Sequence, residues 1–352
     1  MSNDAETDLI VIGGGSAGMA AAIQAAILGM KVTVFDASGI DYDKPCGEGL
    51  MPPAVTALRQ LGVVIPECFP FGGIKYFLHT GEVASARFPR GAKAIGVRRR
   101  LLRRAMWERA MSLGVKIIDD RAATIVESND GVVVDGVCAK WLCLATGSRD
   151  PILKQLGLQD PRGRGNRPRR LGLRRHAQIA PWSDSVEVYW NDDCELYVTP
   201  VSESRVNIAI LSWTSRSFED ALKLFPAIQN RLIQVEWDDP VRGVAPLSHK
   251  ADRVQKGRVF VAGDAAGFID AMTGEGNTLA IRSGMAVAES IAMNQASKYR
   301  WLWISIVWRY WLVTTLAMTL NRYPLSRNIA LKAVVRWPML LRVGVGILSA
   351  EI

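Results

Sequence analysis

The chain of 352 residues is poor in the residues that build metal sites and disulfide frameworks. It has three histidines (His79, His176 and His249) and five cysteines, with no CxxC pair and no metal-ligand spacing among them. We therefore predict no bound metal and assign no catalytic role to histidine. The odd cysteine count favours a reducing compartment, and the acidic first residues are unlike a secretory signal. These absences predict a cytoplasmic protein. Peripheral binding to the inner face of a membrane is compatible with that location.

Acidic residues are fewer than basic ones: 43 lysines and arginines face 34 aspartates and glutamates, a formal net charge of +9. The surplus is concentrated in residues 98–104, in residues 162–175 and in the C-terminal region. Such clusters suit anionic partners, namely cofactor phosphates, a lipid surface or an acidic carrier protein, and an ordinary solvated surface accounts for each equally well. Because no recognition motif accompanies the arginines, we exclude nucleic acid as a partner.

A glycine-rich turn near the start lies between elements of a βαβ unit. Residues 8–13 read as a buried strand, 16–28 as a small-residue helix and 31–36 as a second buried strand. The glycines permit close approach of backbone N–H groups, and the helix N-terminus favours a pyrophosphate. The carboxylate that ends the second strand can accept hydrogen bonds from a ribose. The predicted dinucleotide-binding residues are Gly13, Gly15, Ser16, Ala17, Gly18 and Asp36; a glycine turn without a ligand is the alternative.

A second glycine-rich segment follows about 250 residues later. Residues 258–262 read as a buried strand, so Asp264 lies just beyond its carboxyl end, where it can accept a hydrogen bond from a ribityl hydroxyl. Residues 273–277 lead into a helix beginning near Thr278, whose N-terminal N–H groups would stabilise the negative charge of a reduced flavin. The predicted flavin-binding residues are Gly263, Asp264, Gly274, Gly276 and Asn277. Together the two segments predict FAD held along its whole length, with a helix-capping turn as the alternative for the second.

The order of these motifs resembles the FAD-dependent oxidoreductases of the aromatic-hydroxylase and geranylgeranyl-reductase superfamily, over roughly residues 8–290. The similar blocks are GxGxxG, Pro-Cys-Gly-x-Gly at 45–49, Gly-Asp-Ala-Ala-Gly at 263–267 and Thr-Gly-Glu-Gly at 273–276. The resemblance implies that Arg99 lies against the FAD. It also implies NAD(P)H as a transient reductant that binds without a Rossmann domain of its own, and the absence of a second GxGxxG is compatible with this. The arginines of 162–175 are candidates for its phosphates, and a solvated loop is the alternative.

Two residues near the Pro-Cys-Gly turn are candidates for catalysis. The resemblance to geranylgeranyl reductases implies that Cys46 faces the flavin and substrate, where a thiol can donate a proton or shape the pocket; a small apolar filler in a tight turn is the structural alternative. Glu48 is a polar candidate close by, with bridging of a glycine loop as its alternative. Thr146 occupies the position where the hydroxylases usually carry Asp. This difference weakens the hypothesis of ordinary NAD(P)H-driven hydroxylation unless Asp150 takes over the role of that Asp.

We predict an α/β fold with a discontinuous Rossmann-like FAD-binding domain, an inserted antiparallel β-sheet substrate domain and a helical C-terminal region. The expected boundaries are 1–72, 92–150 and 250–296 for the FAD-binding domain, 73–91 and 151–249 for the substrate domain, and 297–352 for the C-terminal region. Residues 301–320 carry four tryptophans and are interrupted by Arg309. This segment suits a helix packed over an apolar substrate tunnel or an interfacial helix in peripheral contact with a membrane.

The leading functional hypothesis is an NAD(P)H-dependent monooxygenase that hydroxylates a small apolar or aromatic substrate, free or carrier-bound, through a flavin C4a-hydroperoxide. The first alternative is a geranylgeranyl-reductase-like ene reductase or dehydrogenase acting on carbon–carbon bonds, favoured by the Pro-Cys-Gly turn and by Thr146. The second alternative is a non-catalytic flavoprotein that binds a membrane or a carrier partner.

Overall fold

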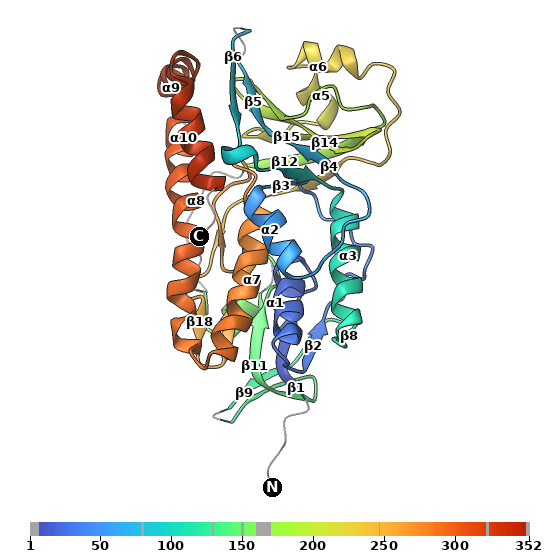
Figure 1. Cartoon of the computed structure of the whole chain (residues 1–352), viewed down its shortest axis with the longest axis vertical. Coiled ribbons are helices and arrows are strands. Elements are labelled where there is room, and N and C mark those ends of the chain that lie inside the picture. The colour runs from blue at the N-terminus through green and yellow to red at the C-terminus, as the bar shows by residue number, and fades with distance from the viewer. Residues whose placement is uncertain are drawn as a thin grey trace.

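The computed structural model describes residues 7–78, 81–128, 130–148, 151–159, 170–245, 247–321 and 324–349. They form two large β-sheets, helices packed on the first sheet and three C-terminal helices (Figure 1). The predicted α/β fold class is confirmed, with a mainly antiparallel second sheet and a helical C-terminal region. The domain boundaries stay a prediction.

The first sheet carries the glycine-rich turns at the ends of its strands. Its order is β18-β19-β11-β1-β2-β8, parallel from β19 to β8, and the β9–β10 hairpin pairs with β11. Strands buried on both faces need continuous apolar runs, and residues 9–12 (LIVI) are such a run. The bounds are β1 Thr7–Ile12, β2 Val32–Phe35, β8 Lys116–Ile118, β9 Ile125–Glu127, β10 Val132–Val134, β11 Val137–Leu144, β18 Gln255–Lys256 and β19 Val259–Val261.

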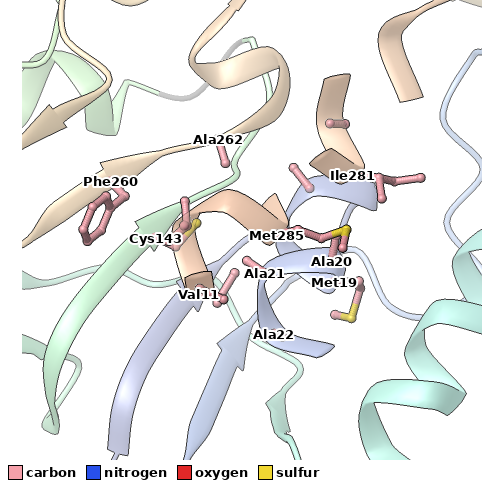
Figure 2. Close-up of a cluster of buried hydrophobic side chains, with 14 of the residues drawn as sticks. Val11, Met19, Ala20, Ala21, Ala22, Cys143, Phe260, Ala262, Ile281 and Met285 are labelled. Carbon is pink, nitrogen blue, oxygen red and sulfur yellow. The ribbon is translucent and has the colours of Figure 1, made fainter. Parts of the chain in front are cut away.

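Three helices cover this sheet: α1 (Ser16–Ile27), α3 (Arg99–Ser112) and α7 (Gly276–Ala292). Helices α1 and α7 approach closely because both carry small residues. A Cβ on Gly284 of α7 would lie 2.2 Å from the backbone oxygen of Ala17 in α1. Figure 2 shows Ala20 and Ala21 of α1 near Met285 of α7 in the buried apolar cluster. The close crossing brings the N-terminus of α7 to that of α1.

The second sheet has the order β16-β12-β15-β14-β13-β5-β6. Alternation along its strands separates two faces: Leu196 and Ile208 pack with Phe218 of helix α5 in a core of their own, whereas Tyr197 and Ala209 line a cavity on the opposite face. Strands β5 and β6 pair antiparallel, next to each other in sequence, at one edge of this sheet. The bounds are β5 Gly73–Phe77, β6 Val83–Arg87, β12 Leu171–Ala177, β13 Val186–Trp190, β14 Cys194–Ser202, β15 Arg205–Ser212, β16 Arg242–Val244, α5 Phe218–Leu222 and α6 Pro226–Arg231.

Short elements join the two large sheets. A Cβ on Gly96 of β7 would lie 1.7 Å from the Pro200 oxygen of β14, so only glycine permits this approach. The bounds are β3 Gly49–Leu50, β4 Phe69–Phe71 and β7 Ala94–Gly96 in one small sheet, β17 His249–Lys250 and β20 Gly267–Phe268 in another, α2 Pro52–Gln60, α4 Ile152–Gln155, and 3₁₀ turns at Pro89–Gly91, Gly263–Ala265 and Ala296–Lys298.

The C-terminal helices α8 (Tyr299–Asn321), α9 (Pro324–Arg336) and α10 (Pro338–Ser349) form a column along one side of the molecule (Figure 1). The Tyr299 hydroxyl donates to the Val261 carbonyl of the first sheet at 2.7 Å, and Val345 of α10 packs with Val186 and Val188 of the second. The column therefore contacts both sheets. Among the described residues, no helix combines the length and apolar character needed to cross a bilayer.

Candidate cofactor and active site

The two glycine-rich segments line one extended cavity between the two large sheets. Of the predicted site residues, all line this cavity except Gly18 and Gly263, which lie directly behind it. A Cβ on Gly18 would lie 1.8 Å from the Gly13 oxygen, and one on Gly263, whose φ is +64°, would lie 2.7 Å from the Cβ of Ala17. These two glycines therefore close the backbone behind the cavity.

The first glycine turn presents open space to a ligand. A Cβ built on Gly15 meets nothing nearer than Arg99 Nη2, at 3.9 Å, and Gly13 takes a φ of +104° that favours glycine. The N-terminus of α1 begins one residue later, at Ser16. An open turn at a helix N-terminus fits a pyrophosphate, as predicted.

Side chains join the two segments directly. The Ser16 hydroxyl donates to Asn277 Oδ1 at 3.2 Å, and Asn277 Nδ2 donates to Cys46 Sγ at 3.4 Å. Helix α7 begins at Gly276, two residues before the predicted start, so Gly274 and Gly276 bracket its N-terminus. The N-termini of α1 and α7 thus face the same space, in the arrangement that FAD requires.

Asp36 ends β2 as predicted and is already engaged. It accepts from the backbone N–H of Gly14, from that of Ser38 at 2.8 Å and from Arg103 Nη2 at 2.7 Å. Arg103 also donates to the Gly14 carbonyl at 2.8 Å. A carboxylate offers about four acceptor positions, so one remains for a ribose hydroxyl. Arg103 was missed by the sequence reasoning, although it lies one helical turn beyond Arg99.

Asp264 lies at the other end of the site, paired with Lys44 at 2.7 Å. Burial alone would raise the pKa of Asp264, but the Lys44 ammonium, with smaller effects from Arg99 and His249, lowers it below the usual value. The carboxylate is therefore charged at neutral pH and available as an acceptor. Arg99 is buried, donates to the Ser16 hydroxyl and lines the cavity between the two ends.

Cys46 is half-buried at the cavity wall. Its carbonyl accepts from Asn207 Nδ2 at 3.0 Å, and its Sγ accepts from the Glu48 backbone N–H at 3.3 Å. The thiol is thus held between α7 and the second sheet. Its catalytic role stays a prediction.

Glu48 is buried and takes a φ of +62°, a strained conformation for a side-chain-bearing residue. One carboxylate oxygen accepts from the Arg99 backbone N–H at 2.8 Å, and the other pairs with His176 Nε2 at 2.6 Å. These contacts fix the N-terminus of α3 against the second sheet. Both oxygens are engaged, which favours the bridging alternative, and the catalytic role also stays a prediction.

His176, to which the sequence assigned no role, is the centre of a buried ionic network. Its Nδ1 lies 2.9 Å from Asp239, and Arg174 pairs with both Asp239 and Asp43. Burial lowers the pKa of His176, but Glu48 and Asp239 outweigh it and raise the pKa above its ordinary 6.5. A protonated His176 balances the network: three carboxylates (Asp43, Glu48 and Asp239) face Arg174, Arg242 and the imidazolium.

A second buried cluster corrects the expectation for the arginines of 162–175. Arg170 pairs with Glu195 at 2.6 Å and also with Asp270, and burial raises the pKa of Asp270 to about 6 although Arg170 opposes the shift. Arg170 and Arg174 are buried and paired with acidic residues, although Arg174 also lines the cavity, and Arg175 stacks on Trp237. The other arginines of that range, like Asp150, lie outside the described residues.

The remaining wall of the cavity is apolar. It comes from the inner face of the second sheet and from the segment before α7, and includes Ile74, Tyr76, Leu173, Val186, Val188, Leu211, Phe268 and Met272. Thr146 lines the opposite side, and its buried hydroxyl has no hydrogen-bond partner within the described part of the chain. The cavity is therefore polar where the glycine turns meet and apolar under the second sheet.

Comparison with known proteins identifies the class. Residues 118–298 match the family model described as FAD binding domain, and residues 7–170 match the model for pyridine nucleotide-disulphide oxidoreductase. The chain belongs to the FAD binding domain family and is a FAD-dependent oxidoreductase. FAD is its cofactor, and NAD(P)H is the reductant typical of the family.

One curated relative and two solved structures show in more detail what the chain is similar to. The chain is 27% identical over 340 residues to a menaquinone reductase of Mycobacterium tuberculosis (strain ATCC 25618 / H37Rv), covering 87% of this chain and 81% of that one. It shares its fold with p-nitrophenol 4-monooxygenase PnpA of Pseudomonas putida (17% identity, TM-score 0.79, 98% and 99% covered). A geranylgeranyl bacteriochlorophyll reductase-like protein of Thermoplasma acidophilum has the same fold (20% identity, TM-score 0.75, 98% and 92% covered). The predicted superfamily is confirmed.

Proposed function

We propose that the chain is a FAD-dependent reductase that uses NAD(P)H to saturate a carbon–carbon double bond of an apolar, lipid-like substrate such as an isoprenoid quinone. The observation that carries the proposal is the apolar wall under the second sheet, facing the polar glycine turns across one cavity. The menaquinone reductase relative supports it, since a menaquinone is an apolar molecule with a prenyl chain.

Different residues along the cavity would hold different parts of the FAD. The turn at Gly13–Gly18 and the N-terminus of α1 would hold the pyrophosphate, Asp36 the ribose, and Asp264 with the N-terminus of α7 the ribityl and flavin end. FAD held there, once reduced by NAD(P)H, would supply a hydride. The apolar wall holds the double bond and excludes water, which keeps the hydride for the substrate.

Cys46 is the proposed proton donor. Saturation of a double bond needs a hydride at one carbon and a proton at the other, and the Cys46 thiol lies at the wall where the glycine turns meet the second sheet. Asn277 Nδ2 donates to its sulfur and stabilises the thiolate left after proton transfer, which solvent then reprotonates. Glu48 acts as a positioning residue, through the Arg99 backbone and His176.

Monooxygenation is the second candidate, because a dry, apolar wall is also what a hydroxylase needs. Thr146 counts against it, as in the sequence, since it lines the cavity without a charge. The fold shared with a monooxygenase does not choose between the two chemistries.

The test is turnover of the FAD-loaded protein with NAD(P)H and a menaquinone, followed by mass spectrometry after re-oxidation in air. Two added hydrogen atoms that survive re-oxidation support saturation of a carbon–carbon bond. Two that are lost in air indicate reduction of the quinone ring alone, and incorporation of isotope-labelled O₂ indicates monooxygenation; either result overturns the proposal. Cys46→Ala should lose at least tenfold in rate with flavin binding retained, whereas Cys68→Ala, outside the cavity lining, should not.

A further inference from the structure

The outward faces of the C-terminal helices carry apolar side chains next to basic ones. Four large apolar residues of α8 follow one another at intervals of seven, four and four residues, so they share one face of the helix. They are Trp301 (69% exposed), Trp308 (48%), Leu312 and Leu316. The opposite face of α8, with Trp303, Val307 and Tyr310, is buried against the first sheet.

The junction of α9 and α10 is the most exposed apolar point of this column. Trp337 is 60% exposed and Met339 is 70% exposed, and Leu340 and Val343 follow on the outer side of α10. Exposed Lys332, Arg336 and Arg342 flank them. Contiguous apolar surface of this kind, rimmed by charge, marks an interaction site.

The positive charge of the C-terminal helices indicates an anionic partner. From residue 290 onward the sequence has one acid, Glu351, and eight basic residues, namely Lys298, Arg300, Arg309, Arg322, Arg327, Lys332, Arg336 and Arg342. Arg327 is bound to Asp192, whereas Arg300 and Arg309 lie over the rings of Trp301 and Trp308. Tryptophan beside arginine on an acid-free apolar face is the composition of a helix at an anionic lipid surface.

We propose that these outward faces, defined as residues 301–316 of α8 and 332–343 of α9 and α10, dock onto a bilayer containing anionic lipids. A second copy of the chain fits less well, because a self-complementary interface would bring like charges together. The wall of the cavity is close to this surface: Val345, on the inner side of α10, belongs to the same buried apolar cluster as Val186 and Val188, which line the cavity. Docking would therefore bring the active site to the membrane, and it goes beyond the proposed reductase activity.

The experiment is flotation of the FAD-loaded protein with vesicles of phosphatidylcholine alone or mixed with phosphatidylglycerol. We expect binding to the mixed vesicles that salt weakens. The triple variant Lys332→Gln, Arg336→Gln, Arg342→Gln should lose on the order of a hundredfold in affinity, since each basic residue near an anionic surface contributes about fivefold. Trp337→Ser with Met339→Ser should also weaken binding and reduce the blue shift of tryptophan fluorescence that docking produces.

Matched controls separate this surface from charge and apolar exposure elsewhere. Arg59→Gln with Lys116→Gln removes exposed basic residues of the first domain, and Ile233→Ser removes an apolar side chain that is 70% exposed. Unchanged binding in these variants supports the proposal. Equal binding to both vesicle types, no binding by folded FAD-loaded protein, or dimerisation that the triple variant abolishes would each overturn it. None of these outcomes depends on turnover, so the proposed reductase activity is judged separately.

Discussion

Glu275, the residue before α7, provides a quantitative test of the electrostatics of a buried carboxyl. Its side chain is buried, and burial raises its pKa from 4.5 to about 8, although Thr278 and Arg282 oppose the shift. The carboxyl is therefore neutral in the folded chain at neutral pH. Glu275→Gln keeps the shape of the side chain and removes its titration.

The sign of the effect follows from proton binding. Between these two pKa values the folded state holds a proton that the unfolded state has released, so the free energy of unfolding falls as pH rises. At about 1.4 kcal/mol per pKa unit, the rise in the pKa of Glu275 from 4.5 to about 8 corresponds to about 5 kcal/mol across the window. The free energy of unfolding of Glu275→Gln minus that of the native chain should grow by this order from about pH 4.5 to about pH 8.

The assay is urea unfolding at a series of pH values, performed separately without flavin and with saturating FAD. Glu67→Gln, which removes an exposed carboxyl, serves as the control and should leave a nearly constant difference. A pH-independent difference for Glu275→Gln would refute the reasoning, because it would mean that the carboxyl titrates alike in both states.

Three further variants test the remaining contacts. The pKa of His176 is raised in the folded state, and the ion pairs of His176 with Glu48 and Asp239 disappear on deprotonation, so the native chain should lose stability as pH rises above 6.5. The variant His176→Gln should not show this pH-dependent loss. Unfolding curves that lose stability equally in both proteins would contradict the reasoning. Gly15→Val should retain the fold and lose at least tenfold in FAD affinity, because its Cβ points into the open cavity. Gly284→Val should instead lower the melting temperature sharply, because its Cβ would clash with the Ala17 backbone. Equal flavin affinity, or equal stability, in the two glycine variants would refute this assignment.

Local patterns predicted the parts of the molecule that local geometry decides. Gly18 must be glycine because a Cβ there would lie 1.8 Å from the Gly13 oxygen in the same turn, so the strand, turn and helix are legible in the sequence. The period-two spacing of Leu196 and Val198, and of Ile208 and Ile210, is likewise a local pattern, and these side chains share one face of the sheet. The same pattern did not reveal that Tyr197 and Ala209, on the other face, line the cavity.

Pairings between distant charged residues could not be predicted. Glu48 and His176 lie 128 positions apart, and Arg170 and Asp270 lie 100 apart, so no spacing rule connects them. The arginine-rich composition of 162–175 suggested an exposed, phosphate-binding surface, yet Arg170 and Arg174 are buried by acids from other segments. Burial of a charge depends on such partners, and these become adjacent only when the two sheets pack.

The position of α10 relates the proposed lipid surface to the proposed chemistry. Its inner side chain, Val345, touches the second sheet beside the cavity, while Met339 and Val343 face outward. A helix with its side chains is about 10 Å across, so this one helix separates the cavity wall from the docking surface. An apolar substrate dissolved in a bilayer would then reach the double-bond site without crossing water. That path explains why an apolar cavity wall and an acid-free apolar exterior would occur on the same side of one flavoprotein.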